Sequence, residues 1–156
     1  MKKRFAYLIL PLITLVLEIL PYGAVVNFAN PEGKPWRKTY SYFDLLPFGY
    51  ANFAPFITAI MTCTGILLIL LFCWKAHTRL IAAARNLFCV CAVISLAPLL
   101  FGIHYFSVVG VLITFSLSAE SLILHFAVRK TGSKEKFLFS SRGAGICTLR
   151  YIHWKK

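Results

Sequence analysis

Residues Pro55–Trp74 read PFITAIMTCTGILLILLFCW, a run without a single charged side chain. An α-helix needs about 20 apolar residues to cross roughly 30 Å of hydrocarbon, and this run has that length. It lacks the alternation of apolar and polar residues that a strand of a membrane barrel shows. Because only helices and closed barrels satisfy their backbone hydrogen bonds in lipid, the run predicts a membrane-spanning helix.

Three further apolar runs flank this one in a chain of 156 residues that is 59% hydrophobic and only 14% charged. Soluble domains carry about 25% charged residues. A chain this small cannot bury so much apolar surface in a core of its own, so it needs lipid as the solvent for that surface. The pattern predicts an all-α membrane protein with a four-transmembrane-helix bundle over residues 1–128. Its spans are expected at about 5–26, 55–74, 87–103 and 105–128, with residues 81–84 extending the third helix into the interface.

The first run has a rival interpretation as a cleaved signal peptide, because Lys2, Lys3 and Arg4 precede it. Its length and the acidic Glu18 within it favour a retained helix.

The basic residues predict the orientation of the bundle. The net charge is +12, and only three of the 17 Lys and Arg residues lie in the segment 27–50. The others lie at the N-terminus, in the link 75–86 and in the tail 129–156, and cationic segments stay on the cytoplasmic side. We therefore expect both termini inside, a structured outer loop at 27–50 and a basic cytoplasmic tail. The expected location is a bacterial cytoplasmic (inner) membrane, as an integral multi-pass protein.

The outer loop is rich in aromatic residues. Asn30–Gly33 is a turn signal, and Tyr40–Phe43 is expected to form a short extended segment. Two interpretations stay open for the aromatic residues. They form either an interfacial belt on the outer leaflet or a lid or docking surface over the bundle.

Glu18 is the residue that most favours a functional site. On a helical wheel it shares one face with polar or aromatic residues, while the other faces hold Leu, Ile and Val. Because lipid does not tolerate a carboxylate, this face must point into the bundle or a wet cavity. The face consists of Tyr7, Pro11, Thr14, Glu18 and Tyr22.

Glu120 is the second acid within a predicted span. The two positions differ in depth by roughly 8–9 Å, so we expect successive stations of a relay and not a shared-proton dyad. Glu120 lies at least about 120° around its helix from Thr114 and Ser118, and so is expected to meet a different neighbour. For both acids a functional role and a structural, hydrogen-bonded role stay open.

Small residues at helical spacing predict two packing seams, because small side chains let helices approach closely in lipid. The candidate packing residues are Thr58, Thr62 and Gly65 in the second span and Gly110, Thr114 and Ser118 in the fourth.

The tail interleaves basic residues with aromatic and aliphatic ones. This pattern favours anionic lipid headgroups, since each charge near the surface contributes about 1 kcal/mol, and nucleic acid is the less favoured partner. Ser140–Gly145 is expected to be a flexible hinge. The candidate headgroup residues are Lys134, Lys136, Arg142, Arg150, Lys155 and Lys156.

Catalytic, metal and cofactor signals are missing from the sequence. The five cysteines contain no CxxC pair, the four histidines show no ligand spacing, and no phosphate loop or nucleophile elbow is present. We expect no metal, no cofactor and no enzymatic activity.

Two functions follow. The first is a non-catalytic accessory or assembly component of a membrane complex, with a membrane protein partner or a homo-oligomer. The alternative is a proton- or cation-coupled small transporter or transport subunit that uses Glu18 and, secondarily, Glu120.

Overall fold

The computed structural model describes residues 5–28, 36–46, 52–75, 77–102 and 107–152, with the side chains of the last helix described as far as Thr131. Most of these residues are helical, as predicted. The elements in chain order are η1 (Ala6–Leu8), α2 (Ile9–Ile19), β1 (Ala24–Phe28), β2 (Trp36–Tyr40), α4 (Ala54–Lys75), α5 (Thr78–Ser95), η2 (Ala97–Phe101) and α6 (Val108–Ile152).

Three helical segments are long and apolar enough to cross a membrane: Ala54–Lys75, Thr78–Leu100 and Val108–Thr131. The first of these agrees with the predicted span 55–74 to within a residue at each end. The second begins well before residue 87, which confirms that the alanine-rich stretch 81–84 is helical. The tight connection predicted at residues 103–105 lies outside the described residues.

The first apolar run departs from its prediction. The apolar helix covers only Ala6–Ile19 and does not reach residue 26. Leu20 is extended, with ψ of 137°, because the proline at position 21 disfavours the helical conformation in the residue before it. The chain then enters β1, where Val25 and Val26 favour a strand. At 1.5 Å per residue, the helical part measures only about 21 Å.

The β-strands form an antiparallel pair in the outer loop. Ala24 pairs with Tyr40, and Phe28 pairs with Trp36. The strand β2 therefore ends at Tyr40, where the predicted extended segment Tyr40–Phe43 was expected to begin. The predicted turn at Asn30–Gly33 lies outside the described residues, between these two paired strands.

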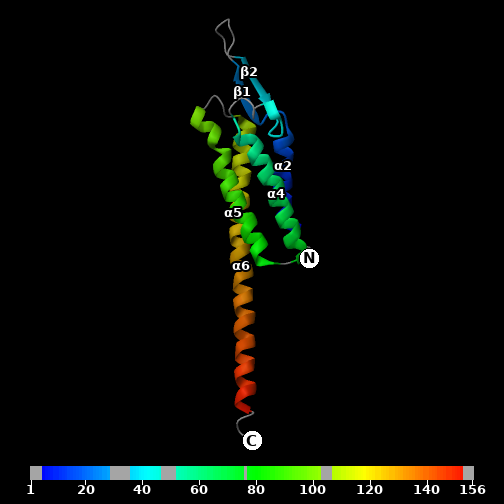
Figure 1. Cartoon of the computed structure of the whole chain (residues 1–156), viewed down its shortest axis with the longest axis vertical. Coiled ribbons are helices and arrows are strands. Elements are labelled where there is room, and N and C mark those ends of the chain that lie inside the picture. The colour runs from blue at the N-terminus through cyan, green and yellow to red at the C-terminus, as the bar shows by residue number, and fades with distance from the viewer. Residues whose placement is uncertain (1–4, 29–35, 47–51, 76, 103–106, 153–156) are drawn as a thin grey trace.

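The last helix is longer than its predicted span. It continues through Ser140–Gly145 to Ile152, so the predicted hinge is wrong. In Figure 1 this helix projects beyond α4 and α5, away from the β-hairpin.

The four main helices form a ring in which each packs against two others: α2 on α4 and α6, and α5 on α4 and α6. Phe5 and η1 lie near the end of α4, and the β-hairpin lies at the opposite end of the bundle (Figure 1). We call these the N-terminal end and the hairpin end.

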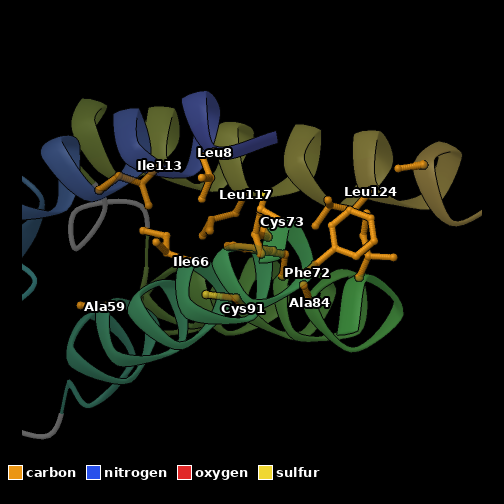
Figure 2. Close-up of a cluster of buried hydrophobic side chains, with 14 of the residues drawn as sticks. Leu8, Ala59, Ile66, Phe72, Cys73, Ala84, Cys91, Ile113, Leu117 and Leu124 are labelled. Carbon is orange, nitrogen blue, oxygen red and sulfur yellow. The ribbon is translucent and has the colours of Figure 1, made fainter. Parts of the chain in front are cut away.

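The ring encloses a core of buried apolar side chains, most of them from α4, α5 and α6, with Leu8 of η1, shown in Figure 2. Ile69, Ile81 and Phe88 are fully buried within it. The outer faces carry many exposed large apolar side chains, among them Val93 and Phe115. Exposed apolar surface of this extent is unfavourable in water and suits contact with lipid.

Candidate functional site

The two acids of the predicted spans both lie inside the bundle. The exposed fraction is 0% for Glu18 and 2% for Glu120. Pro11 and Thr14 are buried on the same face of α2 as Glu18, which confirms most of the predicted stripe. Tyr22 lies beyond the end of the helix and is 59% exposed, so its assignment to this stripe is wrong.

Glu18 meets a threonine of α4. The hydroxyl of Thr62 donates to Oε1 of Glu18 at 2.7 Å, and the same hydroxyl lies 3.1 Å from the carbonyl oxygen of Thr58, one turn earlier. The thiol of Cys91 on α5 lies 3.5 Å from that carbonyl and 3.9 Å from the Thr62 hydroxyl. Thr58 and Thr62 are both fully buried, as the predicted seam requires.

Glu120 meets a threonine of α2 in the same way. The Thr14 hydroxyl lies 2.5 Å from Oε1 of Glu120 and 3.1 Å from the carbonyl oxygen of Leu10, one turn earlier. Ser116, one turn before Glu120 on α6, places its hydroxyl 2.6 Å from that of Thr14. Glu120 thus faces α2, whereas Thr114 faces α5, where it bonds Ser95 at 2.7 Å. The prediction that Glu120 meets a different neighbour from the seam is confirmed.

Each of these threonines has one hydroxyl hydrogen, which can go either to the carboxyl or to a carbonyl in its own helix; at Thr14 the Ser116 hydroxyl is a further neighbour. When the carboxyl is ionised, the hydroxyl donates to Oε1. When Oε1 of the carboxyl carries a proton, that O–H donates to the threonine hydroxyl. The threonine hydroxyl then donates to the carbonyl oxygen one turn earlier in the helix of the threonine. The hydrogen bond to Oε1 is therefore kept in both protonation states, and a change of protonation state requires only that the hydroxyl rotate.

The second oxygen of each carboxyl, Oε2, is buried and has no hydrogen-bond partner within the described part of the chain. A carboxylate without a countercharge is costly in so apolar a site, and uptake of a proton removes that cost. The described residues also contain no group of three or more His, Cys, Asp or Glu side chains suited to a metal ion.

The two acids lie at neighbouring depths. Glu120 bonds Thr14, which is four residues before Glu18, so the carboxyl groups are about one turn, or roughly 6 Å, apart along the α2 axis. That the two acids act as successive stations of a relay stays a prediction.

A loop residue closes the hairpin end of this site. The backbone N–H of Tyr42 and the hydroxyl of Ser41 both donate to the carbonyl oxygen of Glu18, at 3.0 and 2.9 Å. Because α2 ends at Ile19, this carbonyl has no partner in its own helix. The loop supplies that partner.

The Tyr42 side chain enters the bundle and is 2% exposed. Its ring lies so close to Gly23 that a Cβ atom there would be 2.8 Å away, and its hydroxyl is hydrogen-bonded to Ser95. Burial raises the pKa of Tyr42 to about 12, more than the Ser95 bond lowers it. Of the two interpretations of the outer loop, the lid describes Tyr42 better than the interfacial belt.

The predicted packing residues have different outcomes. Gly65 lies against the ring of Phe88 on α5, and Gly110 lies near the carbonyl oxygen of Gly23 and the hydroxyl of Tyr42. Ser118 is exposed and does not take part in the seam. Each step of four residues turns a helix by about 40° more than a full circle, so Ser118 has rotated roughly 80° away from Gly110.

Several residues of the site were not predicted from the sequence. Ser116 was detectable, because it lies one turn from Glu120 and so shares its face. Ser41, Tyr42, Ser95 and Cys91 gave no such signal, since their roles depend on which elements become neighbours. The side chains of Lys134, Lys136, Arg142 and Arg150 in α6, and residues Lys155 and Lys156, lie outside the described part.

No protein-family model, curated protein or solved structure matches the chain. We therefore argue its function from the site itself.

Proposed function

We propose that this chain is a small proton-coupled transporter or transport subunit, in which Glu18 and Glu120 bind protons inside a helix bundle. The observation that carries the proposal is the repeated pairing of a buried carboxyl with a threonine that has a second acceptor in its own helix. Intramembrane acids are costly, and proton or ion pathways are where they are usually kept.

The pairing suits a site that changes its protonation state. A purely structural carboxyl would be expected to use both of its oxygens in fixed hydrogen bonds. Here one oxygen of each acid is bonded to a hydroxyl that both donates and accepts, and the other has no partner within the described residues. Either carboxyl can therefore gain or lose a proton while the helices keep their positions.

The proposed arrangement in the membrane is a four-pass bundle with both termini on the cytoplasmic side of a bacterial inner membrane. Three long apolar helices and the distribution of basic residues support it. We propose that α2 and the following extended segment together make the first pass, because the chain starts at the N-terminal end and reaches the hairpin end by β1.

Flux of protons into liposomes tests this function. Purified protein is reconstituted with a pH-sensitive dye inside, and a potassium gradient with valinomycin drives proton entry. The wild-type protein should acidify the liposome interior faster than occurs in empty liposomes, and Glu18→Gln and Glu120→Gln should each abolish the excess. Glu135→Gln, which removes an acid from the predicted tail, is the control and should behave as wild type. Equal rates for wild type and empty liposomes, or full flux in the double variant, would refute the proposal.

A second candidate is a non-catalytic accessory component of a membrane complex. The observation that favours it is the length of α6, which continues well past the other helices, with no other helix of the described residues beside that part (Figure 1). An isolated helix in water is marginally stable, so this extension suits a partner protein or a lipid surface. Extraction in a mild detergent should then recover a stable heteromeric complex. Recovery of the chain alone, with active proton flux, would reject this candidate.

A further inference from the structure

A small cavity lies beside Glu120, between the first helical turns and α6. Its volume is about 20 Å³, and it is lined by Ala6, Tyr7, Leu10 and Pro11 on one side and by Glu120 and Leu124 on the other. A cavity needs about 10–15 Å³ and polar partners to hold one water molecule. Tyr7 and Glu120 are among the lining residues, and Oε2 of Glu120 is buried without a hydrogen-bond partner within the described part of the chain.

The two acids differ in their surroundings along the bundle axis. The cavity at Glu120 is formed by residues 6–11, which lie toward the N-terminal end. Glu18 lies one turn nearer the hairpin end, where Ser41 and Tyr42 bond its carbonyl oxygen and the Tyr42 ring fills the space over Gly23. The two ends of the site are therefore built differently.

We infer that the cavity binds a water molecule through which Glu120 exchanges protons with the N-terminal side, while Tyr42 closes the opposite side. This inference rests on the proposed function and adds the side of the bundle from which protons reach the two carboxyl groups. In the transfer, a hydronium ion in the cavity gives its proton to the Glu120 carboxylate, which leaves a water and a neutral carboxyl group. Glu120 is then the first station and Glu18 the second.

The groups around Glu120 leave it as the acceptor of that proton. Thr14 and Ser116 are hydroxyls that do not ionise in this range and serve only as hydrogen-bond partners. The titratable groups nearby are Tyr7 in the cavity wall, Glu18 and, on α5, Cys91. Of these four groups the carboxyls are the strongest acids, and Glu120 is the carboxyl that lines the cavity.

Infrared spectroscopy tests the direction of access without any need for transport. The protein is transferred from H₂O to D₂O, and the C=O band of each protonated carboxyl is followed as its proton is replaced by deuterium. Difference spectra against Glu18→Gln and Glu120→Gln assign the bands. The Glu120 band should shift first, and the Glu18 band later.

Ala6→Leu should fill the cavity and slow the exchange at Glu120 several-fold. Ala83→Leu makes the same change at an exposed position on α5 and should leave the rate unaltered. Tyr42→Phe keeps the ring but removes its bond to Ser95, and should speed exchange at Glu18 more than at Glu120.

The outcomes separate this inference from the proposed function. If the carboxyl bands appear and titrate but Ala6→Leu exchanges at the wild-type rate, or if Glu18 exchanges first, the water site is wrong and proton binding stands. If no protonated carboxyl band appears at any pH at which the protein is folded, both are overturned.

Discussion

Gly65→Ala tests the close contact between α4 and α5. A Cβ atom at position 65 would lie 2.5 Å from Cζ of Phe88 and 2.8 Å from Cε2. The ring is fully buried between α4 and α5 and so has little room to retreat. Overpacking of this kind costs about 1–3 kcal/mol.

The substitution also has a favourable part, because alanine is preferred over glycine in a helix by about 1 kcal/mol. With so short a contact we expect the clash to dominate, for a net loss of about 1–2 kcal/mol. For a chain of this size the melting temperature should fall by roughly 2–8 °C, at about 2–4 °C per kcal/mol. Phe88→Leu removes the ring, so in that background Gly65→Ala should become neutral or stabilising.

Thermal unfolding in detergent measures this effect through thiol labelling, since the thiols of Cys73 and Cys91 are buried in the folded bundle. Thr64→Ala, at the exposed neighbour of Gly65, is the control and should change the midpoint little. An unchanged midpoint for Gly65→Ala, or an equal loss in the Phe88→Leu background, would refute the close packing of α4 on α5.

Three further outcomes are expected. Thr14→Val should destabilise the bundle by about 1–3 kcal/mol where Glu120 is ionised, because the carboxyl loses its donor, and Thr14→Ser should restore most of the midpoint. Tyr42 should ionise near pH 12 in an ultraviolet absorbance titration. Its folded pKa exceeds the ordinary value of 10.0, so its contribution to stability is complete below pH 10 and declines toward pH 12, a loss that Tyr42→Phe should not show. Reporter tags at Gly33 and Lys156 should appear on opposite faces of the membrane, and tags on one face would contradict the four-pass arrangement.

Hydropathy and charge predicted the long helices well, because membrane insertion depends on composition summed over a whole segment. The end of the first helix was missed for a local reason. Leu20 precedes a proline and becomes extended, and a sum over the apolar run does not register that change. The uninterrupted α6 was missed because glycine and serine indicate a hinge only when nothing else favours a helix.

The candidate site was predictable only one helix at a time. The wheel placed Thr14 with Glu18 and showed that Glu120 faces away from Thr114. The wheel did not show that α2 packs against both α4 and α6. Because of this packing, Thr62 of α4 bonds Glu18, and Thr14 of α2 bonds Glu120. Pairing across helices depends on tertiary packing, which the periodicity of one segment does not contain.

Proton binding by Glu18 and Glu120 is measured most directly by counting protons. Wild-type protein and the Glu18→Gln/Glu120→Gln double variant, both in lipid nanodiscs, are titrated with acid against a pH indicator, and the difference between the curves is taken. The difference should show additional uptake by the wild type, approaching one proton for each of the two carboxyl groups. Superimposed curves over the whole range in which both proteins stay folded would contradict the account.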